Sequence, residues 1–99
     1  MKNTHQDWIE MRKESEKIFR ALAALTERDP AEEEVQKAIA RWHQLIDNRF
    51  YKCNLEMFRQ LANLYVSDNR SSANIDKYKP GLAKFMRDAM HLYCDKQEK

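Results

Sequence analysis

The chain has 99 residues, which is enough for one domain with a buried core. It contains only one Gly and two Pro, the residues that commonly form the turns between strands, and it is rich in residues that favour helices. A charged fraction of 34% and the lack of any apolar run of about 18 residues exclude a membrane span. We therefore predict an all-α protein without membrane association.

The charges give no sign of a nucleic-acid partner. The 18 Lys and Arg are interspersed with 16 Asp and Glu, and the formal net charge is +2. A nucleic-acid-binding protein usually carries a clustered basic face, so we expect no direct nucleic-acid binding by this chain. The N-terminus, Met-Lys-Asn-Thr-His, lacks the apolar core of a signal peptide, and the expected compartment is therefore cytoplasmic.

Five segments carry apolar residues at helical spacing and predict helices at roughly 5–27, 30–51, 54–66, 68–77 and 80–95. The first has an apolar stripe of only about 120°, so we expect it at the periphery. In the second, Asp29 is the predicted N-cap and Pro30 the first helical residue, and the three Glu that follow favour a helix start. Pro80 is the predicted first-turn residue of the last helix.

The segment 54–66 has the widest apolar surface and is predicted to be the central helix. Its apolar residues form two adjacent rows, which together cover an arc of roughly 200°. The rows are Leu55, Phe58, Ala62 and Tyr65, and Met57, Leu61 and Leu64. The segment 80–95 has a similar arc and is expected to pack against it. Either Cys53 or Asn54 occupies the capping position of the central helix.

The pattern of reactive side chains does not indicate an enzyme, a metal site or a cofactor. His5, His43 and His91 are scattered, and no glycine-rich phosphate loop is present. Cys53 and Cys94 lie far apart without metal spacing, so two free, buried thiols are favoured over a disulfide. The ten aromatic and five Met side chains are mostly core by the simplest interpretation; the alternative is a groove for apolar ligands.

Several short motifs, in order and at matching spacing, give the chain a family resemblance that covers nearly all of it. The chain resembles the TipAS antibiotic-recognition domain, the C-terminal effector part of MerR-type transcriptional activators that respond to thiopeptides or to multidrug-transporter substrates. The motifs are Tyr51-Lys52-Cys53, residues 65–70, Asn74-Ile75-Asp76 and residues 79–89. Asp7-Trp8 and Tyr93-Cys94-Asp95 also resemble the multidrug branch of the family.

The resemblance implies a single globin-like helical domain over residues 1–99, a TipAS-like ligand-binding effector domain with a cleft for large lipophilic antibiotics. It also implies N-terminal helices that are loose without ligand and close over it. In the thiopeptide-capturing member, the cysteine that forms the drug adduct aligns with Gln60, which has no thiol. The DNA-binding and coiled-coil segments of the regulators are absent from this sequence. We therefore expect an excised effector domain or a free-standing ligand binder, with a dimer forming only through the missing segments.

Together, the pattern and the resemblance predict reversible, non-catalytic binding of a lipophilic small molecule or a thiopeptide-like antibiotic. The predicted groove lies between the central helix and the end of the second one, and the first helix forms a lid. Cys53 is a possible reactive thiol, with a buried cap residue as the alternative. The predicted wall residues are Phe50, Tyr51, Met57, Gln60, Leu61 and Leu64, and the predicted lid residues are Trp8 and Met11.

Two other functions fit the same apolar surface. A protein-interaction module would use the groove to accept an amphipathic partner helix. A purely structural helical domain would have a closed core and no groove. A nucleic-acid role is the weakest alternative, because no basic patch is evident.

Overall fold

The computed structural model describes residues 5–50 and 52–98, without the side chains of residues 5–8 and 50. The described chain forms five α-helices and one short π-helix and contains no strand, which confirms the all-α prediction. No helix in this part of the chain combines the length and apolar character needed to cross a membrane. The elements are α1 (His5–Ala23), α2 (Glu33–Leu45), η1 (Ile46–Phe50), α3 (Leu55–Ser67), α4 (Asn69–Asp76) and α5 (Leu82–Gln97).

The helix at the centre of the core is α5. It packs against α1, α2, α3 and α4, and α3 is its most extensive partner. The prediction that the third and last helices pack together is thus confirmed, but the prediction that the third helix is the central one is wrong. Only one apolar row of α3 is buried, consisting of Phe58, Ala62 and Tyr65. Seven side chains of α5 are buried: Leu82, Ala83, Phe85, Met86, Ala89, Met90 and Cys94.

The starts of α3 and α4 are fixed by side chains that accept hydrogen bonds from backbone N–H groups, and the start of α5 is fixed by a glycine. Asn54 caps α3 by accepting from Met57 N at 2.9 Å, and Asp68 caps α4 by accepting from Ser71 N at 3.2 Å. Gly81 directly precedes α5. Its backbone has a φ of 90°, in the left-handed region, which glycine adopts more readily than other residues. Of the two predicted capping residues for α3, the structure therefore selects Asn54.

One boundary of each of α1, α2 and α5 differs from the prediction, because the chain forms tight turns where helix was predicted. After Ala23, hydrogen bonds to the third preceding carbonyl replace the α-helical pattern, and the Thr26 hydroxyl also donates to Ala23 O at 3.1 Å. Asp29 does not cap α2; its carboxylate accepts from Ala31 N at 2.9 Å in a turn that contains Pro30, and α2 begins at Glu33. Pro80 likewise lies outside α5.

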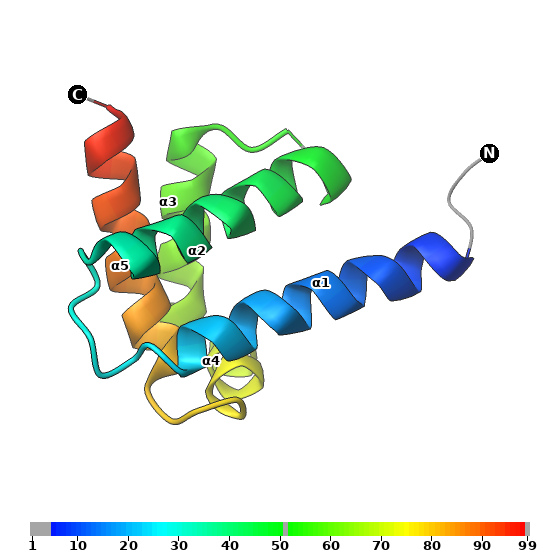
Figure 1. Cartoon of the computed structure of the whole chain (residues 1–99), viewed down its shortest axis with the longest axis horizontal. Helices are drawn as coiled ribbons and strands as arrows, with labels where there is room; N and C mark the ends of the chain where they lie inside the picture. The colour runs from blue at the N-terminus through cyan, green and yellow to red at the C-terminus, as the bar shows by residue number, and fades with distance from the viewer. Residues whose placement is uncertain (1–4, 51, 99) are drawn as a thin grey trace.

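The first helix is attached through its C-terminal half. Figure 1 shows α1 and α2 side by side across α3 and α5, with the N-terminal half of α1 extending beyond the other helices. Ile18 and Leu22 are buried. The ring of Phe19 lies 4.9 Å from that of Trp42 and 5.4 Å from that of Tyr78, between centroids. These contacts hold residues 18–22, whereas residues 9–17 contribute no buried side chain.

Two equivalent substitutions test the central position of α5. Met90→Ala removes a fully buried side chain and should lower the free energy of unfolding by about 2–5 kcal/mol through lost burial and a cavity. Met57→Ala removes a side chain that is 41% exposed and should lower it by less than about 1 kcal/mol. Urea denaturation of both variants measures the difference, and equal losses would contradict the arrangement.

Candidate ligand-binding site

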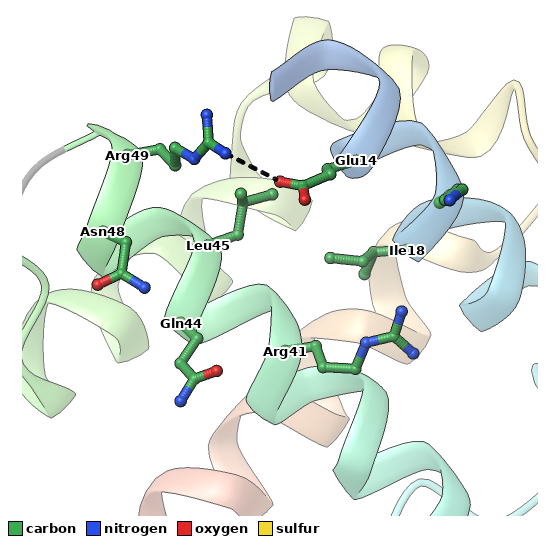
Figure 2. Close-up of a pocket in the computed structure, with 8 residues that line it drawn as sticks. Glu14, Ile18, Arg41, Gln44, Leu45, Asn48 and Arg49 are labelled. Atoms are coloured by element: carbon green, nitrogen blue, oxygen red, sulfur yellow. Dashed lines mark ion pairs between the residues drawn. The ribbon is translucent and has the colours of Figure 1, made fainter. Parts of the chain in front are cut away.

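A cleft separates α1 from α2 and the π-helix that continues it. Its volume is about 340 Å³, which lies at the lower end of the range for ligand pockets. The last turn of the second helix is a π-helix, a local change that often occurs at functional sites. The lining residues are Glu14, Lys17 and Ile18 from α1, Arg41, Gln44 and Leu45 from α2, and Asn48 and Arg49 from η1 (Figure 2).

The cleft has an apolar floor and charged sides. Ile18 and Leu45 are buried at its base. Arg49 and Glu14 approach each other to 4.0 Å across the cleft, which links η1 to α1 (Figure 2). Both side chains are partly exposed, so this pair stabilises the packing of α1 against η1 only weakly.

A second feature is the apolar row of α3 that the core does not cover. Met57 is 41% exposed and Leu64 is 46% exposed, while Leu61 between them is half-buried against the core. Ile9, on the N-terminal half of α1, is 43% exposed. Among the described residues, these three exposed side chains all belong to the elements predicted to form the wall and the lid.

The exposed row lies on the side of α3 opposite to Arg59, which binds α5. At about 100° per residue, Met57, Leu61 and Leu64 lie roughly 140–160° around α3 from Arg59, whose side chain binds α5. In Figure 1, α5 lies on one side of α3, and η1 and the N-terminal half of α1 extend on the other.

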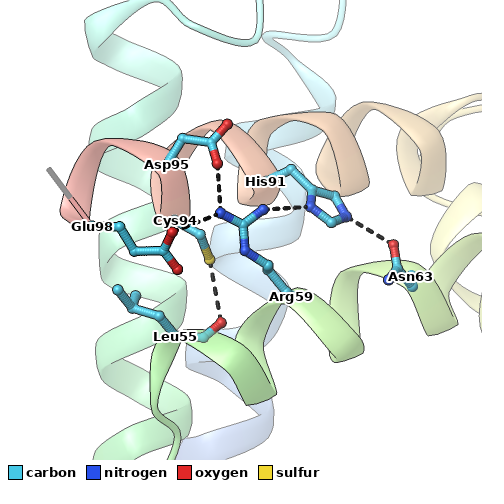
Figure 3. Close-up of polar contacts among 7 residues, drawn as sticks. All are labelled: Leu55, Arg59, Asn63, His91, Cys94, Asp95 and Glu98. Atoms are coloured by element: carbon cyan, nitrogen blue, oxygen red, sulfur yellow. Dashed lines mark hydrogen bonds and ion pairs between the residues drawn. The ribbon is translucent and has the colours of Figure 1, made fainter.

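The opposite face of α3 is attached to α5 by a polar network (Figure 3). Arg59 donates to the carboxylates of Asp95 and Glu98. It also donates to His91 Nδ1 at 3.1 Å, and His91 Nε2 donates to Asn63 Oδ1 at 2.8 Å. Because an arginine can only donate, this arrangement requires the neutral ring of His91. Burial and the charges of Arg59 and Arg87 lower the pKa of His91, against the smaller opposing effect of Asp95 and Asp88.

The connection between η1 and α3 is held at Cys53. Its backbone N–H donates to Asp47 Oδ1 at 2.9 Å, and its carbonyl accepts from His43 Nε2 at 2.7 Å. His43 is itself packed against Phe58, with ring centroids 4.6 Å apart, and bonded to the Tyr93 hydroxyl at 3.1 Å. Both backbone groups of Cys53 are therefore fixed by helix side chains, so this end of the predicted groove is rigidly attached.

Both thiols are free and buried, as predicted. Burial raises the pKa of Cys53, and the neighbouring Asp47 carboxylate raises it further. Burial likewise raises the pKa of Cys94, whose thiol donates to Leu55 O at 3.4 Å. Since the thiolate is the reactive form, these environments disfavour reaction at either cysteine.

The structure brings only some of the predicted site residues together. Met57, Leu61 and Leu64 share the exposed row, and Gln60 is exposed beside it on the same helix. Met11 is half-buried on α1. Tyr51 and the side chains of Trp8 and Phe50 lie outside the described residues.

None of the predicted site residues whose side chains the structure describes lines the cleft, and the residues that do line it were missed by sequence reasoning. Arg41, Gln44, Leu45 and Asn48 do recur every three or four residues, which places them on one face of the second helix. That spacing was a usable signal for a shared surface. It does not reveal that the facing wall is residues 14–18, because their proximity depends on how α1 packs against α2.

The sequence also matches known proteins. The model of the TipAS antibiotic-recognition domain family matches residues 1–93. The chain is 37% identical over 92 residues to the HTH-type transcriptional activator mta of Bacillus subtilis, covering 93% of this chain and 36% of mta. It is 40% identical over 89 residues to the HTH-type transcriptional activator TipA of Streptomyces coelicolor, covering 88% of this chain and 35% of TipA. The chain thus spans about a third of the length of these relatives.

Two solved structures are similar in fold. One is TipAS from Streptomyces lividans in complex with nosiheptide, from a thiopeptide antibiotic multidrug resistance system. Its TM-score is 0.90 and its sequence identity is 34%, and the match covers 97% of this chain and 68% of the TipAS chain. The other is the antibiotic binding domain of a TipA-class multidrug resistance transcriptional regulator, with a TM-score of 0.82, 33% identity and coverage of 90% and 97%. The chain belongs to the TipAS antibiotic-recognition domain family, which confirms the resemblance predicted from the sequence.

The network between α3 and α5 predicts a pH-dependent stability. A lowered pKa in the folded state means that the contribution of neutral His91 is complete above its ordinary pKa of 6.5 and is lost as the pH falls below that value. The free energy of unfolding should therefore fall more steeply between about pH 7.5 and about pH 5.5 in the native chain than in His91→Gln, which keeps one donor and one acceptor but does not titrate. Denaturation at a series of pH values measures both slopes, and identical slopes would refute the assignment.

The buried cysteines predict slow reaction with thiol reagents. An aromatic disulfide reagent should modify Cys53 and Cys94 in the folded chain on the order of a hundredfold more slowly than in urea, because reaction requires local opening. Absorbance of the released thiol measures the rate, and Cys53→Ser identifies which residue reacts. A Cys53 that reacts as fast when folded as when unfolded would be inconsistent with this burial.

Proposed function

We propose that this chain binds a bulky lipophilic antibiotic, such as a thiopeptide, reversibly and without catalysis. The ligand contacts the exposed row of α3 and the cleft between α1, α2 and η1. The observation that carries the proposal is the exposed apolar row of Met57, Leu61 and Leu64 on α3. It occurs in a fold that also has an open cleft and is similar to that of nosiheptide-bound TipAS.

The available apolar surface is sufficient for useful affinity. Burying ~300 Å² of apolar ligand surface at ~25 cal/mol/Å² contributes roughly 7 kcal/mol before ordering costs. Immobilising the N-terminal half of α1 against the ligand would offset several kcal/mol of that. We therefore expect affinities near the micromolar range for flexible drugs and tighter binding for a rigid macrocycle.

Gln60 makes the binding reversible in this proposal. It is exposed on α3 next to Leu61, at the position that aligns with the adduct-forming cysteine of the thiopeptide-capturing relative. An amide is not a nucleophile at neutral pH, and both native thiols are buried. The complex is therefore held by contacts alone.

In a full-length protein, we assign the chain to the ligand-sensing part of a MerR-type transcriptional regulator in the cytoplasm. Closure of α1 over the ligand, with Met11 and Trp8 toward it, would order a helix that is anchored only at residues 18–22. A ligand that binds the closed arrangement preferentially shifts the population toward it, and this shift is the signal. A free-standing drug binder would use the same closure to sequester the compound.

The exposed row also supports a second candidate function, the docking of an amphipathic partner helix. Met57, Leu61 and Leu64 have the spacing of four and three residues that a helix-in-groove interface uses. This function would be favoured if a partner peptide competed with hydrophobic dyes and the chain showed no response to antibiotics. The family membership favours the small-molecule ligand.

An amide NMR titration with nosiheptide tests the proposed function. Shifts should concentrate in residues 57–64 and in the cleft-lining segments 14–18 and 41–49, and hydrogen exchange should slow in the N-terminal half of α1. Leu64→Gln should weaken binding about tenfold, because it removes apolar contact without disturbing a buried position.

The matched control is Ala73→Gln, which places the same side chain at an exposed position on α4. It should leave the affinity unchanged. Absence of shifts in every segment with nosiheptide and with a panel of other lipophilic compounds would reject the proposed function, and equal effects of the two variants would reject the site.

A further inference from the structure

The cleft holds an excess of positive charge. Three cations, Lys17, Arg41 and Arg49, and one carboxylate, Glu14, line it. Its net charge of +2 equals the formal net charge of the whole chain, so the charges of the remaining residues balance. The residues that line the cleft therefore give it a net positive charge.

Two of these cations are available to a ligand. Arg49 approaches Glu14, but neither Lys17 nor Arg41 forms an ion pair in the part of the chain that the structure describes. Arg41 extends from α2 toward α1 (Figure 2). A guanidinium is a rigid group with five N–H donors, and it can bind a carboxylate through two parallel hydrogen bonds. The amides of Gln44 and Asn48 add further donors beside it.

We propose that this cleft selects amphiphilic ligands that carry an anionic head, such as a carboxylate, and disfavours lipophilic cations. Arg41 and Lys17 bind the head, Ile18 and Leu45 contact the start of the apolar body, and the exposed row of α3 contacts the remainder. This selectivity rests on the proposed function and names the ligand class for that same site.

The physical basis is that charge and apolar surface lie next to each other. A ligand cation would have to give up hydration to enter a cleft with a net charge of the same sign. A ligand anion replaces its hydration with charge-assisted hydrogen bonds, which are about twice as strong as neutral ones. Ligands with the same apolar body should therefore be ranked by the charge of the head.

A series of three fluorescent ligands tests the ranking. Pyrenebutyrate, pyrenebutanol and pyrenebutylamine share one apolar body and differ in the charge of the head. Fluorescence titration at low salt should give the tightest binding for the acid and the weakest for the amine. Arg41→Gln should weaken the acid about tenfold and leave the alcohol unchanged. Glu14→Gln should strengthen the acid, because it removes the one carboxylate and releases Arg49.

Lys84→Gln and Arg70→Gln are the controls, since both residues are exposed on other elements and each variant loses one positive charge. The proposal is overturned if acid and amine bind equally, if Arg41→Gln weakens all three ligands alike, or if the controls have the same effect as Arg41→Gln. If no pyrene ligand binds while nosiheptide does, the charge selectivity is wrong and the proposed function stands. If neither binds, both are wrong.

Discussion

Burial of α5 is the constraint that arranges the other helices. Its apolar side chains cover an arc of roughly 200°, and the free energy of removing them from water grows with the area buried. Each of α1, α2, α3 and α4 contributes one face to this cover. The face of α3 toward α5 is further fixed by the hydrogen bonds of Arg59 and Asn63 to the C-terminal half of α5 (Figure 3). With α3 held in this orientation, its second apolar row has no helix to cover it, and Met57 and Leu64 remain exposed.

The same core accounts for the uneven burial of side chains along α1. Leu22 and Phe19 reach the core and the ring of Trp42, whereas no side chain of residues 9–17 is buried. Stability is not uniform along such a helix, and the segment with few buried contacts opens at the lowest free energy. A ligand between α1 and the rest of the domain would supply the apolar contacts that this half lacks. Under the proposed function, ligand binding would therefore be coupled to ordering of this half of α1.

The proposed binding site combines two chemically different surfaces. Ligand pockets generally join a large apolar area with a few polar groups that set orientation. Here the apolar area is the row on α3, and the polar groups are the cations of α1, α2 and η1 around the cleft. The loop between these surfaces is fixed at Cys53 by Asp47 and His43, so the relative position of η1 and α3 is set before any ligand arrives. Preorganisation of this kind lowers the free energy that binding must supply for ordering.

The sequence by itself determined the helical class, the approximate helix positions, the two buried thiols and the family, because periodicity, composition and local motifs are properties of neighbouring residues. It also identified Met57, Leu61 and Leu64 as apolar beyond the needs of a surface helix. It did not determine that α5 rather than α3 is central, since two helices with equally wide apolar arcs are distinguished only by what packs around each. Helix ends at Ala23 and Glu33 depended on turn hydrogen bonds that compete with helix caps. Only the tertiary structure placed residues 14–18 opposite residues 41–49, because a cleft between two helices is defined by their packing and not by either sequence alone.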